Sequence, residues 1–300
     1  MQIYISADME GITGLVDSLD VQPGGADYER GRIMMTEDVN AAVRGALTAG
    51  ATTVLVNDAH GPMRNILPEQ LHPAAQLVRG RPKAMGMLEG LDATFDATVC
   101  VGYHARAGTL GVLSHSFMGH EIEDIWLDSY SVGEIGMVHA TAAALGAPVV
   151  LLTGDDAASA EMTDWDPAVE TVPVKRARGR FAAQLLPVMQ ARQAIESSAA
   201  AAIEAACGET VPTQGTPRLG GSPRPAPASP PPGGQSLGQR PTLAVRWQSA
   251  SVAAMLLGIP GVTLRDSRTI QVTGTMPELF RLHGLLMHVA VPGPAQGPYC

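Results

Sequence analysis

Four short apolar runs rich in Val, Ile and Leu constrain the fold of the first half of the chain. They lie at residues 2–7, 52–56, 97–102 and 148–153. Runs of this length without alternating polar residues are typical of strands that are buried on both faces of a sheet. Because both faces of such a sheet must be covered, the sequence between the runs should supply helices.

Two helical patterns connect these runs. Residues 29–49 place apolar side chains on one face of a helix, and Gly50 follows as a C-terminal stop. A second helix is predicted at residues 133–145, which Gly146 ends. A strand, a helix and a strand in succession indicate a parallel pair of strands. We therefore predict an α/β fold in which a largely parallel sheet is sandwiched by helices.

The second half of the chain predicts a smaller α+β part. Its expected elements are an Ala-rich helix at 187–206, strands at 242–247 and 261–273, and a helix at 276–289. Residues 212–241 hold nine prolines, six glycines and no acidic residue, so they cannot bury enough apolar surface to become ordered. We therefore predict a metal-binding catalytic domain at 1–175, a smaller part at 176–211 and 242–300, and a disordered Pro/Gly-rich insertion at 212–241.

Charge and cysteine content exclude several classes of protein. The chain has 29 acidic and 20 basic residues, and only two of the bases are lysines, Lys83 and Lys175. With a net charge of −9, a nucleic-acid-binding surface is not expected. The three cysteines are too far apart for a disulfide framework or a zinc ribbon, which favours a reducing compartment. Because the sequence has neither a signal-peptide pattern nor a long apolar window, we expect a cytoplasmic protein with no membrane partner.

Acidic and imidazole side chains follow the first three predicted strands. Asp8 and Glu10 follow the first run, His60 follows the second and His104 follows the third. A carboxylate after a strand is usually a turn or helix-cap residue. The carboxyl ends of parallel strands share one edge of a sheet, however, and this edge is where ligands bind. The coincidence at three strands therefore indicates a single site.

The donor types at this site favour a transition metal. Asp8 and Glu10 are two residues apart and point to the same side of an extended chain. Glu134, near the start of the second helix, adds a third carboxylate to the imidazoles of His60 and His104. This mixture suits Zn²⁺ or another first-row divalent ion, because Mg²⁺ and Ca²⁺ prefer oxygen ligands alone. Five ligands are too many for one open tetrahedral zinc, so we predict two ions with Asp8 as the bridging ligand.

His115 is the candidate catalytic residue. It stands between two serines in a Gly-rich loop that leaves the same sheet edge as His104, and an imidazole there could accept or donate a proton. Asp58, Asp155 and Asp156 could orient ligands or cap turns and helices, and the sequence does not decide between these roles. A serine-hydrolase elbow, a P-loop and a dinucleotide-binding glycine motif are all absent from the sequence.

Several motifs together resemble the zinc-dependent D-aminopeptidase family, also labelled dipeptide-transport protein A. They lie in order between residues 1 and about 175, and they are Ser6-Ala7-Asp8-Met9-Glu10-Gly11-Ile12, Tyr28-Glu29-Arg30-Gly31-Arg32, Val56-Asn57-Asp58-Ala59-His60, Glu89-Gly90-Leu91-Asp92, Gly102-Tyr103-His104-Ala105-Arg106, Ser114-His115-Ser116 and Gly154-Asp155-Asp156. The resemblance implies a binuclear zinc exopeptidase that removes N-terminal residues from short peptides, with some members preferring D-amino acids.

The resemblance also implies roles for individual residues. The family's metal ligands fall on Asp8, Glu10, His60, His104 and Glu134, and its catalytic histidine falls on His115, which the family treats as a nucleophile. Members form large ring-like homo-oligomers, so a homo-oligomer, by analogy a decameric ring, is expected. The sequence itself leaves the role of His115 open between nucleophile, general acid/base and stabiliser of the tetrahedral intermediate.

Two other functions remain open at this point. The older family label suggests a peptide-binding component of dipeptide uptake, although a periplasmic binder would need a signal peptide. A different two-metal amidohydrolase or phosphatase could use the same sheet edge. Release of amino acids from D-Ala-D-Ala-type peptides, compared with L-peptides and phosphate esters, separates these functions from an aminopeptidase.

Overall fold

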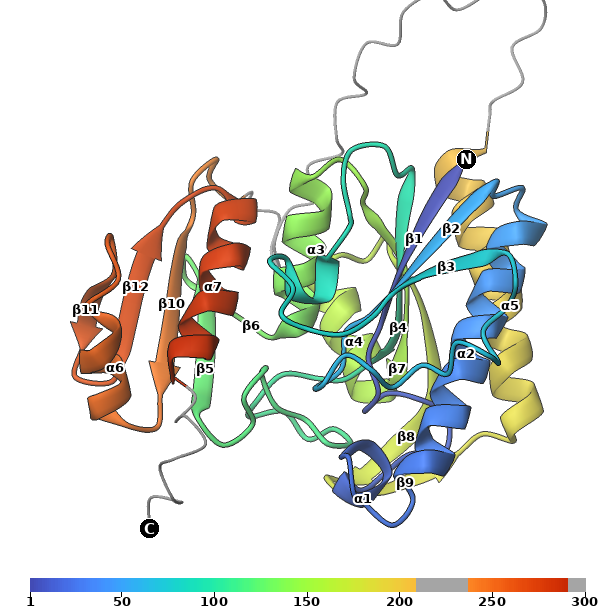
Figure 1. Ribbon diagram of the computed structural model, residues 1–300, viewed down its shortest axis with the longest axis horizontal. Coiled ribbons are helices and arrows are strands. Elements are labelled where there is room, and N and C mark those ends of the chain that lie inside the picture. The colour runs from blue at the N-terminus through green and yellow to red at the C-terminus, as the bar shows by residue number, and fades with distance from the viewer. Residues whose placement is uncertain (209–236, 291–300) are drawn as a thin grey trace, which may run out of the picture.

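The chain forms two sheets, which lie side by side in the computed structural model (Figure 1). The structure describes residues 1–208 and 237–290. Sheet A has seven strands in the order β3-β2-β1-β4-β7-β8-β9, and sheet B has five in the order β11-β12-β10-β5-β6. All neighbouring pairs in sheet A are parallel except the last, β8 with β9, and all pairs in sheet B are antiparallel. The predicted α/β fold with a largely parallel sheet is confirmed.

The strands of sheet A include the four predicted runs. Its strands are β1 (Gln2–Ala7), β2 (Thr53–Asp58), β3 (Ala75–Val78), β4 (Ala97–Tyr103), β7 (Val149–Asp155), β8 (Glu170–Gly179) and β9 (Ala182–Leu185). Every side chain of β4 and of β7 is buried. Their continuous Val and Leu content is therefore explained by two covered faces rather than one.

Helices cover both faces of sheet A. On one face, α2 (Tyr28–Thr48) and α5 (Val188–Cys207) form a core with alternate side chains of β1 such as Ile3 and Ile5. On the other face, α3 (Glu134–Ala144) and α4 (Asp156–Trp165) pack with Tyr4 and Cys100. The alternate side chains of one strand thus enter two different cores, as the period of two residues requires.

Sheet B joins segments from both halves of the sequence. Its strands are β5 (Ile122–Leu127), β6 (Tyr130–Val132), β10 (Thr242–Trp247), β11 (Thr263–Asp266) and β12 (Thr269–Thr273). The helices α6 (Ala250–Leu256) and α7 (Met276–Ala290) pack against it, and their apolar side chains continue the core around α3. Two short helical segments, α1 (Ser18–Val21) and η1 (Gly86–Leu88), lie in the loops after β1 and β3.

The grouping of segments differs from the predicted boundary near residue 175. Residues 122–132 pair with β10 in sheet B, whereas β8, β9 and α5 belong with sheet A. The predicted strand at 261–273 is a hairpin, because Asp266 accepts the backbone N–H of Arg268 and turns the chain. Sequence order alone does not reveal that the chain enters sheet B and returns before its last third.

Two sequence predictions concern segments outside these elements. Residues 209–236 hold most of the predicted insertion at 212–241, and that prediction falls outside the described residues. Among residues 1–208 and 237–290, no helix is long and apolar enough to cross a membrane.

Candidate metal centre

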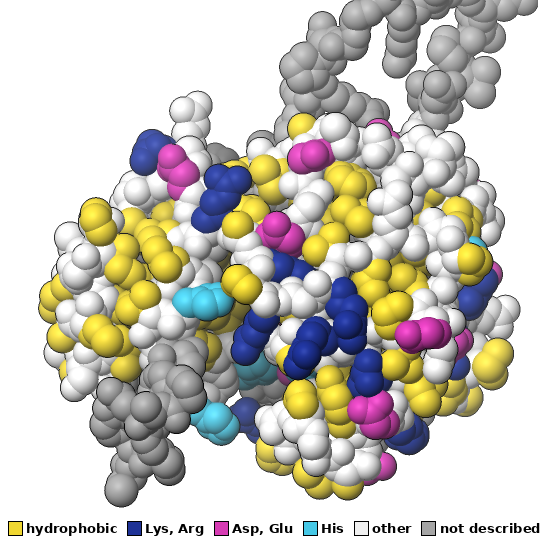
Figure 2. All heavy atoms as spheres, viewed as in Figure 1, with side chains coloured by type: hydrophobic (Ala, Val, Ile, Leu, Met, Phe, Trp, Pro, Cys, Tyr) yellow, Lys and Arg dark blue, Asp and Glu magenta, His cyan; other side chains and the backbone are white. Residues whose placement is uncertain are grey.

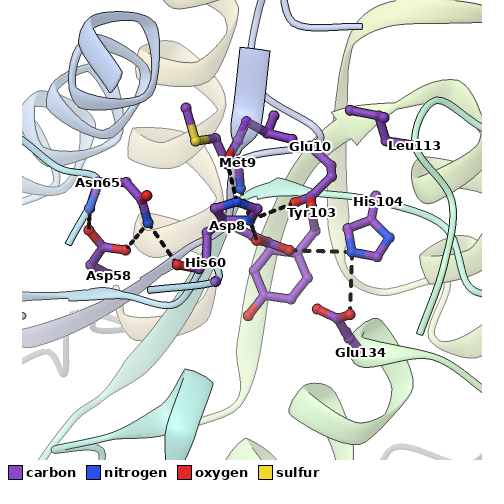
Figure 3. A network of polar contacts seen from close by, with 12 residues as sticks. Asp8, Met9, Glu10, Asp58, His60, Asn65, Tyr103, His104, Leu113 and Glu134 are labelled. Carbon is purple, nitrogen blue, oxygen red and sulfur yellow. Dashed lines mark hydrogen bonds and ion pairs between the residues drawn. The ribbon is translucent and has the colours of Figure 1, made fainter. Parts of the chain in front are cut away.

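The six predicted site residues lie together at the carboxyl edge of sheet A. Figure 3 labels the predicted ligands Asp8, Glu10, His60, His104 and Glu134. The edge is formed by β2, β1 and β4, which are neighbours in the sheet. Asp8 and Glu10 follow β1, His60 follows β2, and His104 follows β4. Glu134 is the first residue of α3, and His115 comes from the loop between β4 and β5. The shared edge predicted from the polar residues after three strands is therefore present.

The loop after β1 is fixed by backbone contacts with the end of β4. The N–H of Asp8 donates to Val101 O at 2.8 Å, and the N–H of Gly11 donates to Gly102 O at 2.8 Å. A Cβ atom on Gly11 would lie 2.0 Å from the carbonyl oxygen of Tyr103. Only glycine permits this approach, which places Asp8 and Glu10 beside His104.

His60 is oriented through both ring nitrogens. Its Nε2 lies 2.9 Å from the backbone oxygen of Val21, which can only accept a hydrogen bond, so Nε2 carries a proton. Its Nδ1 then faces Asp8 Oδ1 at 3.2 Å and Glu10 Oε2 at 3.0 Å. The carbonyl of His60 accepts from Asn65 Nδ2. The histidine is thus presented to two buried carboxylates.

His104 repeats this arrangement on the other side of Asp8. Its Nδ1 donates to the backbone oxygen of Ala105 at 3.0 Å. Its Nε2 lies 3.5 Å from Asp8 Oδ2 and 3.4 Å from Glu134 Oε1. Both Asp8 Oδ2 and His104 Nε2 are buried and make no hydrogen bond within the described residues. An unprotonated nitrogen facing two carboxylates is unfavourable unless a proton or a metal cation lies between them.

The pKa values of these groups reflect the same need for positive charge. Burial, together with the Glu10 carboxylate, raises the pKa of Asp8 to about 7. Burial alone would lower the pKa of His60 and of His104, but neighbouring carboxylates, Glu10 and Glu134 respectively, raise both well above the usual histidine range. The cluster therefore binds protons strongly when no metal is present, and a bound cation would displace them.

His115 has a different environment from the other two histidines. Its Nδ1 donates to Leu113 O at 2.9 Å, which leaves Nε2 as the basic nitrogen, 3.9 Å from Glu134 Oε1. The ring stacks on His104 with centroids 4.2 Å apart. Burial, and then the charge of His104, lower the pKa of His115. With a side chain 19% exposed, it is a neutral base that a ligand in the cavity can reach.

Glu134 is held in place from the loop that carries His115. The backbone N–H of Phe117 donates to its Oε1 at 2.6 Å. Glu134 also lies in the first turn of α3, where the helix dipole favours a negative charge. Burial would raise its pKa, but His104 and His115 lower it. The carboxylate is therefore kept ionised beside both imidazoles.

The donor sets fit a metal centre. Three groups of three residues bring ligand atoms within 4.8 Å of one another: Asp8, Glu10 and His60; Asp8, His104 and Glu134; and Glu10, His104 and His115. The first two groups share Asp8 and together use all five predicted ligands. Their mixed nitrogen and oxygen donors are those that zinc accepts in proteins.

The three aspartates whose roles the sequence left open support loops. Asp58 accepts from the backbone N–H groups of Asn65 and Ile66 and so closes the turn that carries His60. Asp155 caps α4 and also accepts from the N–H of Val112 in the His115 loop. Asp156 accepts from the N–H of Ala177, near the end of β8.

A cavity of about 1100 Å³ opens above the cluster. Histidine and basic side chains gather at the hollow between the part with sheet A and the part with sheet B, as Figure 2 shows. The sequence predictions did not find its other walls, which include Arg81, Lys83, Arg180, Phe280 and His283. Lys83 could have been singled out only because lysine is scarce in this chain. No sequence pattern links the arginines or the residues of α7 to this site.

The chain is similar to known proteins along most of its length. Residues 1–219 match the model of a peptidase family, M55, described as D-aminopeptidase. A D-aminopeptidase of Bacillus subtilis (strain 168) is 41% identical over 204 residues, which cover 68% of this chain and 74% of that protein. A solved structure, the Zn-dependent D-aminopeptidase DppA from Bacillus subtilis, described as a self-compartmentalizing protease, has a TM-score of 0.85, 31% identity and full coverage of both chains. The chain therefore belongs to the D-aminopeptidase family.

Proposed function

We propose that this protein is a zinc-dependent aminopeptidase that releases the N-terminal residue of short peptides containing D-amino acids. One observation carries the proposal: His60 and His104 each donate one ring N–H to a backbone carbonyl and turn the other nitrogen toward buried carboxylates. This is how metal-binding histidines are usually oriented in proteins. The family membership and the zinc dependence of the solved relative support the same conclusion.

Two zinc ions per chain would be held by five ligands, Asp8, Glu10, His60, His104 and Glu134. The proposal of two ions rests on the two donor sets that share Asp8. Zinc in such a centre polarises a carbonyl group and makes water a nucleophile at neutral pH.

The protein's own residues would position the peptide and handle its protons. His115 presents Nε2 to the cavity, because its Nδ1 is held by Leu113 O. From there it could take a proton from the attacking group, attack the carbonyl itself, or stabilise the tetrahedral intermediate. The cavity of about 1100 Å³ is large enough for a peptide of a few residues.

The assembly and location of the protein remain predictions. The solved relative is described as self-compartmentalizing, which supports a homo-oligomer for this chain as well. The decameric ring is expected from the family resemblance, and the cytoplasmic location from the sequence.

Metal analysis and an activity panel test the proposal. Purified protein should contain close to two zinc ions per chain and should release D-alanine from D-Ala-D-Ala-type peptides faster than it cleaves L-peptides or phosphate esters. His115→Ala should keep its zinc and lose turnover. Well under one divalent ion per chain would refute the metal centre, and full activity of His115→Ala would remove that residue from the reaction.

A further inference from the structure

Lysine is rare in this chain, and both lysines lie next to the proposed metal centre. Only Lys83 and Lys175 occur among twenty basic residues. Elsewhere in the sequence the basic side chains are arginines, so lysine is not simply the default cation of this protein. The presence of an ammonium group at these two positions therefore needs a physical explanation.

Lys175 reaches across the carboxyl edge of sheet A to the loop that carries Glu10. It lies on β8, three strands from β1 in the sheet order, and the residue is only 1% exposed. Its Nζ donates to the backbone oxygens of Glu10 at 2.6 Å, Ile12 at 2.9 Å and Leu15 at 2.6 Å. All three N–H donors of the ammonium are used, and all three acceptors belong to one loop.

Lys83 makes an equivalent set of contacts at the end of β2. Its Nζ donates to Asp58 O at 2.6 Å, Asn57 Oδ1 at 2.7 Å and Val78 O at 3.3 Å. Asp58 lies two residues before His60 and closes the turn that carries it. Lys83 therefore ties the end of β3 to the segment that presents a second predicted ligand.

The geometry explains why the residue is lysine. An ammonium group points three N–H donors in tetrahedral directions and can meet three carbonyl oxygens that converge on one point. The guanidinium of arginine is planar and larger, and its donors spread as a fork. Arginine would keep the charge at position 175 but could not reach the same three oxygens in a fully buried site.

We propose that Lys175 and Lys83 are positioning residues, which hold the backbone of the two loops that present Glu10 and His60 to the metals. This inference rests on the proposed zinc centre. Outer partners of metal ligands typically change metal affinity about 10- to 100-fold when they are removed. The same loss is expected for Lys175→Met, with a smaller loss for the half-buried Lys83→Met.

Zinc affinity and hydrogen exchange test the proposal. Zinc affinity is measured by competition with a chelator in Lys175→Met, Lys175→Arg, Lys83→Met and the wild type. Amide exchange of the metal-free proteins follows Gly11 and Thr13, whose N–H groups are bonded to Gly102 O and Asp38 Oδ2. Lys175→Met should weaken zinc binding about 10- to 100-fold and speed this exchange, and Lys175→Arg should not restore either property.

Arg44→Met is the control for the loss of a cationic hydrogen bond at a partly exposed position. It removes a cationic hydrogen bond between α2 and α5, Arg44 Nε to Glu196 Oε2 at 2.7 Å, away from the centre, and should change neither measurement. Unchanged zinc affinity and exchange in Lys175→Met would overturn the proposal. If Lys175→Met does not fold, the test rests on Lys83→Met. A zinc affinity of Lys83→Met equal to that of the wild type would then overturn the proposal. A wild type that binds no zinc refutes the proposed function instead, while the exchange data still decide whether Lys175 holds the loop.

Discussion

Replacing Gly11 with alanine should damage the metal centre although it touches no ligand side chain. Gly11 follows Glu10 directly and donates its N–H to Gly102 O, two residues before His104. The loops that carry two of the predicted ligands are therefore in direct backbone contact. A single methyl group placed between them is a sensitive test of how the centre is built.

The size of the effect follows from the contact distances. The added Cβ would lie 2.0 Å from Tyr103 O, 2.6 Å from Gly102 C and 2.7 Å from Gly102 O, whereas real Cβ atoms essentially never come closer than 3.0 Å. All these neighbours are backbone atoms, so at least one loop must move by about 1 Å. A displacement of that size near reacting groups costs about 100-fold in rate, or about 2.7 kcal/mol of transition-state stabilisation.

Steady-state kinetics and zinc titration measure this effect. Gly11→Ala should lower kcat/KM about 100-fold and weaken zinc binding, because Asp8 and Glu10 move relative to His104. Gly179→Ala is the control, since a Cβ there meets no atom within 4 Å. If Gly11→Ala has the kinetics and zinc affinity of Gly179→Ala, the loop contact does not set the ligand geometry and the reasoning fails.

Three further predictions concern pH and charge. The acidic limb of the pH profile of kcat/KM should have an apparent pKa below 6.5, the ordinary value for histidine, because burial and His104 lower the pKa of His115. Zinc content is measured across the same pH range, and an apparent pKa above 6.5 at full zinc content would contradict this prediction. Burial raises the pKa of Glu161 from 4.5 to about 7, so the folded protein holds this proton more tightly than the unfolded chain, and the free energy of unfolding should fall as pH rises from about 4.5 to about 7. Between pH 5 and pH 8, this decrease in the free energy of unfolding should be about 2 to 3 kcal/mol smaller in Glu161→Gln than in the wild type, as measured by urea unfolding. An equal decrease in the variant and the wild type would refute this prediction. Among the described residues that line the cavity, the acids all belong to the metal cluster, whereas Arg81 and Arg180 are cationic. Arg81→Gln or Arg180→Gln should therefore raise KM about two- to fivefold for peptides with a free C-terminal carboxylate. An equal rise in KM for amidated peptides would argue against a contact with that carboxylate.

The parallel sheet could be predicted because its signal is local. The runs that form β1, β2, β4 and β7 are short and rich in apolar residues, and nearly all of their positions are buried. The strands of sheet B carry a weaker signal. For example, β5 mixes buried and partly buried positions without a regular alternation, and its partner β10 lies more than a hundred residues away. Pairing of that kind depends on tertiary contacts that no local pattern encodes.

The clustering of the predicted site residues could be predicted because ligand chemistry is visible in residue types. Asp8, Glu10, His60 and His104 each follow a strand that ends at the same edge, and this rule needs no side-chain geometry. The residues that hold the ligand loops were missed for the opposite reason. Lys175 acts through backbone oxygens, and an acceptor of that kind is present at every position of every sequence.

The supporting contacts also explain how three carboxylates can lie close together. Asp8, Glu10 and Glu134 are buried within one cluster, and like charges at this spacing repel one another. Protons on His60 and His104 offset part of this repulsion while the metal is absent, but they must leave when the cation binds, so other contacts must also hold the loops. The contacts that can do so involve backbone groups: Gly11 to Gly102, Asp58 to the turn after His60, Phe117 to Glu134, and Lys175 to the Glu10 loop. These contacts preorganise the ligands, because the free energy needed to bring the charges together comes from folding rather than from metal binding. Zinc therefore binds more tightly than it would to unheld loops.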